Sequence, residues 1–106
     1  MPKYLFRASY TAAGAAGILK EGGSPRVKAV EALAKSVGGS IESMYWALGA
    51  DDFYCIADMP DINAAAALSL TVGASGAVKV TTAPLLSAAD VDELVRRRVE
   101  YRAPGA

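Results

Sequence analysis

The sequence predicts a single α+β domain, built from a four-stranded antiparallel sheet with its main helices on one face. Its 106 residues suffice for one hydrophobic core and are too few for two domains of ordinary size. Hydrophobic residues make up 53% and charged residues 21%, which is typical of a globular chain. The strands and the two main helices follow one another in the order β-α-β-β-α-β, with a short helix before the first main one and a last helix after the fourth strand.

Four segments rich in aromatic and β-branched residues are expected to form the strands: residues 3–10, 40–48, 53–59 and 77–86. The second and third are joined by Gly49-Ala50-Asp51-Asp52, which is typical of a tight turn, so these two strands should pair antiparallel. Turn formation is the expected role of the two adjacent aspartates.

The helices before the last one are expected to begin at residues that can cap free backbone N–H groups: Thr11, Ser24 and Asp61. The first is a short helix over 12–20, and the third reaches about Val72. The second has Pro25 at its first helical position and an apolar stripe on one side. Gly38-Gly39 is expected to end it.

A last helix is expected after Ser87, which forms a shortened capping box with Asp90. Its apolar residues recur at spacings of three and four, so we expect it to bury one side: Val91, Leu94 and Val95. The arginine run that follows is typical of a solvated helix face. The domain is therefore expected to span residues 1–100, with a flexible tail over 101–106.

Right-handed crossovers place both main helices on the same face of the sheet, which predicts a ferredoxin-like βαββαβ sandwich with a C-terminal helix. The other face should then be polar, but residues 44–48 and 53–57 are apolar or aromatic in both phases of the strand. An apolar face of that size needs a cover. The simplest cover is the sheet of a second copy, so we expect a homodimer or a larger homo-oligomer.

Several short motifs carry a family resemblance: Pro2-Lys3-Tyr4, Tyr10-Thr11, Gly22-Gly23-Ser24, Gly38-Gly39, Gly49-Ala50-Asp51-Asp52-Phe53-Tyr54 and Ala66-Ala67-Leu68-Ser69-Leu70. Together they resemble the GYD domain family over roughly residues 2 to 87. The resemblance implies a dimeric α/β barrel, in which two ferredoxin-like sheets face each other across a cavity. It implies no particular activity, because proteins of this wider barrel group include oxygenases, isomerases, haem-binding enzymes and ligand sensors.

The residue types present exclude several kinds of site. The chain has no histidine and one cysteine, Cys55, so zinc sites, Ser-His-Asp triads and histidine-ligated haem are unavailable within one chain. We expect no metal and no cofactor. The formal net charge is zero, which predicts neither nucleic-acid nor membrane binding. A lone thiol and the lack of a signal-peptide pattern at the N-terminus predict a cytoplasmic protein.

Polar side chains on the sheet face away from the helices are the candidates for a ligand site. By strand alternation Tyr4, Phe6 and Ala8 should pack under the helices, while Arg7 and Ser9 point the other way. The same alternation turns Lys79 and Thr81 toward the cavity. We expect a rim cluster of Arg7, Asp58 and Lys79, with Tyr45, Trp46 or Tyr54 as a wall. The tentative ligand-binding set comprises Arg7, Tyr45, Tyr54, Asp58 and Lys79.

Three functions are compatible with these residues. The first is an oligomeric protein that binds a small molecule in the barrel cavity. The second is an enzyme in the same cavity, a cofactor-free oxygenase or isomerase, and the sequence leaves open whether any reaction is catalysed. The third is a structural module whose homo-oligomeric assembly is its role.

Overall fold

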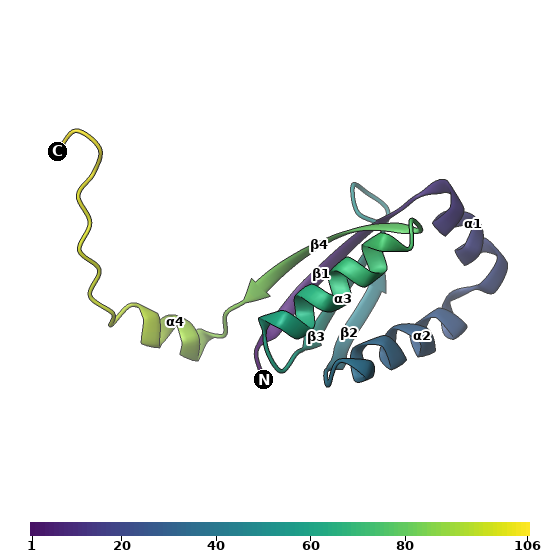
Figure 1. Ribbon diagram of the computed structural model, residues 1–106, viewed down its shortest axis with the longest axis horizontal. Coiled ribbons are helices and arrows are strands. Elements are labelled where there is room, and N and C mark those ends of the chain that lie inside the picture. Colours follow the sequence, from purple (N-terminus) through teal and green to yellow (C-terminus); the bar gives the residue numbers. More distant parts are fainter.

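The computed structural model describes all of residues 1–106 and confirms the α+β class (Figure 1). In chain order the elements are β1 (Lys3–Tyr10), α1 (Ala12–Glu21), α2 (Gly23–Ser36), β2 (Ser40–Trp46), β3 (Phe53–Asp58), α3 (Ile62–Ala74), β4 (Val78–Leu85) and α4 (Ala88–Leu94). Every strand and helix expected from the sequence forms. No helix is long and apolar enough to cross a membrane.

The four strands form one sheet in the order β2-β3-β1-β4, and every neighbouring pair is antiparallel. This is the strand order of the ferredoxin-like fold. Helices α2 and α3 lie on the same side of the sheet (Figure 1). The central strand β1 pairs along its whole length with β4 and along most of it with β3, so its side chains occupy the middle of both faces.

Side-chain caps define three of the four helix starts, as the sequence predicts. The Thr11 hydroxyl accepts a hydrogen bond from Gly14 N at 3.2 Å, and an Asp61 carboxylate oxygen accepts one from Ala64 N at 2.8 Å. Ser87 and Asp90 form a reciprocal capping box at the start of α4.

The expectation that Ser24 caps α2 is wrong. Helix α2 already begins at Gly23, no side chain caps it, and Ser24 lies inside its first turn. Gly22 is the reason: its φ of 81° is readily adopted only by glycine, and it lets one residue end α1 and start α2. At the other end, Gly38 N and Gly39 N donate to the carbonyls of Lys35 and Ala34, which closes the helix as predicted.

The hydrophobic core lies between the sheet and α2 and α3. Tyr4, Phe6 and Ala8 of β1 are buried there, which confirms the predicted alternation of that strand. The other buried core residues are Ala34, Phe53, Cys55, Ala57, Met59, Ala65, Leu68 and Val78. On β4 the Thr82 hydroxyl is hydrogen-bonded to the Ser69 hydroxyl of α3, so this strand also turns its even-numbered residues toward the helices.

The expected burial of α4 is wrong. Val91, Leu94 and Val95 are all exposed, and so is every residue from Leu86 to Ala106. We call residues 86–106 the arm; it extends beyond one end of the sheet (Figure 1). The capping box and the apolar spacing specify a helix with an apolar side, but the chain itself provides no surface to cover that side.

Candidate ligand-binding face

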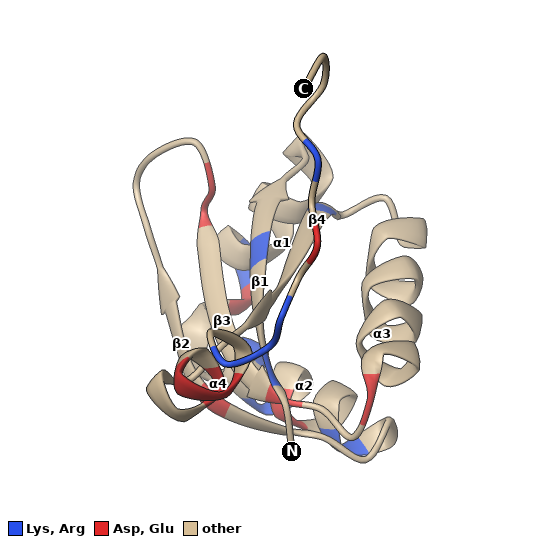
Figure 2. Ribbon diagram, turned by 90° about the vertical axis from the view of Figure 1, so that its left-hand side faces the viewer, with Lys and Arg blue, Asp and Glu red and all other residues tan.

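The sheet face opposite α2 and α3, here called the open face, carries the side chains that alternate with the core. None of the helices packs across it, and Figure 2 shows α3 on the other side of the sheet. The strand register aligns its side chains in rows that cross all four strands. The Arg7 row consists of Tyr45, Tyr54, Arg7 and Thr81, and the neighbouring Leu5 row of Ser43, Ile56, Leu5 and Ala83.

Arg7 lies in the middle of the open face with most of its hydrogen-bonding capacity unused. Its side chain is 41% exposed, and its Nη1 is 3.9 Å from Asp51 Oδ2, which is too long for a hydrogen bond. Its Nε is buried and has no hydrogen-bond partner. A guanidinium presents five N–H donors in a rigid fork, so Arg7 can still bind a planar anion.

The hairpin loop, residues 47–52, is fixed to the end of β1 by its aspartates. The Ser9 hydroxyl lies 3.2 Å from Asp51 Oδ1, and Tyr10 N donates to Asp52 Oδ2 at 2.8 Å. Asp52 N in turn donates to the Ala8 carbonyl at 2.8 Å. The turn-forming role expected for these two residues is thus what the structure shows, and Asp51 additionally places a negative charge beside Arg7.

The expected rim cluster of Arg7, Asp58 and Lys79 does not form. Asp58 lies opposite Lys3 and binds it, with Lys3 Nζ 2.9 Å from Asp58 Oδ1. Arg7 is four strand positions away from Lys3, or about 13 Å. Lys79 lies opposite Ser9, beyond Arg7 in the other direction. Strand alternation gives the face that each residue occupies but not its row, and the rows keep these charges apart.

At the arm end of the open face, Lys3 forms ion pairs with two carboxylates, those of Glu42 and Asp58. A β-bulge at Glu42 shifts the register of β2 relative to β3 by one residue. Glu42 Oε1 lies 2.7 Å from Lys3 Nζ. The hydrogen bonds that Lys3 donates to Glu42 and Asp58 raise its pKa above the usual value. Lys3 is therefore fully compensated within the chain, and the two carboxylates share this single cation.

The aromatic residues of β2 divide between the two faces. Tyr45, 70% exposed, lies in the Arg7 row beside Tyr54. Trp46 lies on the helix side, where its ring is 5.3 Å from that of Phe53 and its Nε1 donates to Tyr10 Oη at 2.9 Å. Trp46 is therefore not part of a cavity wall on the open face.

The comparison with family models agrees with this architecture. A model described as GYD domain matches residues 4–95, which include the whole sheet apart from Lys3, and α4. The chain belongs to the GYD domain family. Comparison with curated proteins and with solved structures gives no significant match.

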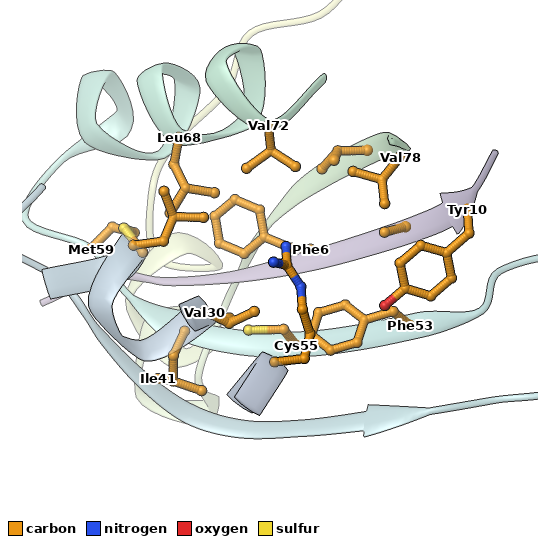
Figure 3. A pocket seen from close by; sticks show the side chains of 14 residues that line it. Phe6, Tyr10, Val30, Ile41, Phe53, Cys55, Met59, Leu68, Val72 and Val78 are labelled. Carbon is orange, nitrogen blue, oxygen red and sulfur yellow. The ribbon is translucent and has the colours of Figure 1, made fainter. Parts of the chain in front are cut away.

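This GYD domain also has a small cavity on the helix side, which the sequence reasoning missed (Figure 3). It lies between α2, α3 and the sheet, and Phe6, Cys55 and Leu68 are among its mostly apolar lining. Its volume is about 60 Å³, well below the roughly 150 Å³ of an apolar cavity that binds benzene. That is too small for an organic ligand, so the open face remains the candidate site.

No three histidine, cysteine, aspartate or glutamate side chains of the GYD domain come together as metal ligands. Cys55 is buried in the core, and burial raises the pKa of its thiol to about 11. The thiol therefore stays protonated near neutral pH and packs as a small apolar side chain.

Proposed function

We propose that this GYD domain binds a small organic anion on its open face, and that a second copy closes over the face to form the cavity. The observation that carries the proposal is the position of Arg7. It lies at the centre of an uncovered sheet, its Nε is unpartnered, and it is flanked in the same row by Tyr54 and Thr81.

The neighbours of Arg7 favour a carboxylate attached to an apolar or aromatic body. Arginine binds carboxylates through two parallel hydrogen bonds, and tyrosine offers a ring for stacking with a hydroxyl at its edge. The Leu5 row beside it supplies apolar contacts through Leu5, Ile56 and Ala83. Lys79, one row beyond, adds a second positive charge on this face, whereas Asp58 lies too far away to contact the same small ligand.

Closure by a second copy strengthens such a site. An exposed arginine–carboxylate pair contributes little in water, because solvent competes for both partners. Covering the face lowers the local dielectric constant and buries the Leu5 row, so both the charged and the apolar contacts become stronger. The homo-oligomer expected from the sequence and the ligand site thus support each other.

The hydroxyl groups around Arg7 favour binding over catalysis, because no other side chain orients them. None of the Tyr45, Tyr54 and Thr81 hydroxyls is hydrogen-bonded to another group of the chain that would orient it as an acid or base. General acid–base catalysis needs a positioned proton donor or acceptor. Recognition of an anion needs only the donors of Arg7 and the hydroxyl groups around it.

Benzoate is a suitable probe, with the uncharged benzamide as its control. We expect benzoate, and not benzamide, to shift the backbone amide resonances of the Arg7 row. Arg7→Gln should abolish the shifts, and Lys28→Gln, which removes the same charge from an exposed position on α2, should leave them unchanged. A dimer whose spectrum responds to neither compound would favour the purely structural module.

A further inference from the structure

Two surfaces of this chain lie uncovered at opposite ends of the sheet. The arm leaves the sheet at the end where Lys3 pairs with Leu85, whereas the hairpin loop lies at the end where Ala8 pairs with Phe53. The arm exposes several large apolar side chains: Leu86, Val91, Leu94, Val95, Val99 and Tyr101. The hairpin loop carries Leu48, whose side chain is fully exposed.

The exposed surface of the chain is large enough to contain a dimer interface. The chain exposes 7324 Å², whereas a compact monomer of 10.9 kDa exposes about 5,600 Å². The excess of about 1,700 Å² is roughly twice what one partner contributes to a stable dimer. The radius of gyration is 16.8 Å, compared with about 13 Å for a compact domain of this length.

The arm also forms one side of a groove. Helix α4 and the arm end of the open face enclose an open groove of about 820 Å³, to which Ile56 and Leu94 contribute apolar surface. Helix α4 therefore lies on the side of the sheet where a second copy would sit. Whatever covers the open face meets this groove as well.

Of the charged side chains around the groove, all except Asp90 form ion pairs within the chain, and Asp90 is held by the cap of α4. Lys3 binds Glu42, Asp90 accepts a hydrogen bond from Ser87 N, and Glu93 binds Arg97 at 2.9 Å. In Figure 2 the acidic residues of α4 are followed directly along the arm by basic ones. The part of the groove that no ion pair occupies is therefore largely apolar, through residues such as Ile56 and Leu94. The hairpin loop is similar, because Asp51 and Asp52 are held by β1 while Leu48 is left exposed.

Because exposed Leu48 matches the apolar surface of the groove, we propose that the hairpin loop of a second copy docks in the groove between α4 and the open face. The two-fold axis lies between the two facing sheets and is perpendicular to the strands. It reverses the strand direction in the second copy, so the arm end of each sheet meets the hairpin end of the other. Both loops then dock in the same way, as an isologous interface requires. Face-to-face sheets lie about 10 Å apart, which is close enough for Leu48 to reach the partner's α4. This inference rests on the face-to-face pairing in the proposed function.

A spin label on α4 tests the docking directly. The Asp92→Cys variant is labelled with a nitroxide at the new thiol. It is then mixed in equal amounts with wild-type chain that is enriched in ¹⁵N and carries no nitroxide. The buried Cys55 leaves the introduced thiol as the reactive one. We expect the label to broaden the amide resonances of residues 47–52 in the ¹⁵N-containing chain, and reduction of the nitroxide to restore them.

Substitution of Leu48 gives an independent measurement. Leu48→Ser should raise the dissociation constant of the dimer by at least about 100-fold, because a buried leucine is lost from each of two equivalent contacts. Leu19→Ser is the matched control, since Leu19 is almost as exposed and lies on α1, away from the interface. A dimer that binds benzoate but shows neither the broadening nor the effect of Leu48→Ser overturns the docking alone. A monomeric chain overturns the closed cavity of the proposed function as well.

Discussion

Lys3 and Asp58 face each other across the first and third strands, with Lys3 Nζ 2.9 Å from Asp58 Oδ1. The pair lies near the end of the sheet, and the Lys3 side chain is 44% exposed. Solvent therefore screens the attraction, and Glu42 at 2.7 Å remains as a second partner for the ammonium group. Asp58, whose side chain is 24% exposed, thus shares the neutralisation of Lys3 with Glu42, and no fully buried charge depends on it.

The first prediction follows from that exposure. Asp58→Ala should leave the denaturation midpoint of the monomeric chain almost unchanged, because Lys3 keeps Glu42 and contact with water. Any small loss should disappear at high salt, where exposed charges are screened. Urea melts at low and high ionic strength measure both effects. A large loss that persists in high salt would show instead that the pair is buried, for example by the partner copy.

The second prediction compares two glycines in the same helix. A Cβ at Gly14 would lie 2.0 Å from the Ala77 carbonyl oxygen, whereas a Cβ at Gly17 would meet nothing within 4 Å. Gly14→Ala must therefore displace α1 from the start of β4, and we expect it to cost about 1–3 kcal/mol. Gly17→Ala should stabilise the chain by about 0.4–1 kcal/mol, because alanine restricts the unfolded state and favours the helix.

Chemical denaturation of the two alanine variants and the wild-type chain checks this comparison. The sign of the change in the free energy of unfolding should differ between the two positions. A Gly14→Ala chain that is as stable as the wild type or more stable would mean that α1 does not contact the Ala77 carbonyl in solution.

The faces of the strands could be predicted from the sequence, but the rows could not. Alternation with a period of two correctly placed Phe6 under the helices and Arg7 on the open face. The row of Asp58 is set by the register between β1 and β3, and these strands are separated in the chain by α1, α2 and β2, so a pattern of apolar residues does not encode their register. For that reason Asp58 was expected beside Arg7 and is found beside Lys3.

The covering of α4 could not be predicted for a different reason. The capping box at Ser87 and the spacing of Leu94 and Val95 correctly predict a short helix with an apolar side. The apolar spacing indicates that this side of α4 is covered. It does not indicate whether the cover is the sheet of the same chain or a second copy. The same limit applies to the open face, whose apolar rows were expected from the sequence while their cover stays a prediction.

The third prediction concerns the loss of helical structure in α4 at low pH. Hydrogen bonds from the Ser87 backbone and then its side chain lower the pKa of Asp90 below its usual value of 3.8. A carboxylate with a lowered pKa stabilises the folded helix above the unfolded pKa, and the contribution is lost as the pH falls through the folded value. The amide resonances of residues 88–94 should therefore move toward random-coil positions below about pH 4. In Asp90→Asn this part of the titration should be absent, and an identical profile in both chains would contradict the capping role.

The fourth prediction uses the one native thiol as a reporter of unfolding. Cys55 is buried between the sheet and the helices, and its pKa of about 11 keeps it protonated at pH 8. The thiolate is the reactive form, so a thiol reagent should modify the native chain only when the core opens. Leu19→Cys, at an exposed position of α1 away from the proposed interface, should in contrast react as fast as a free thiol. The labelling rate of Cys55, followed by mass spectrometry, should fall when Gly17→Ala stabilises the chain and rise with Gly14→Ala. Rapid labelling of Cys55 in the folded wild-type chain, with no dependence on either substitution, would show that the core between α2 and α3 is open to solvent.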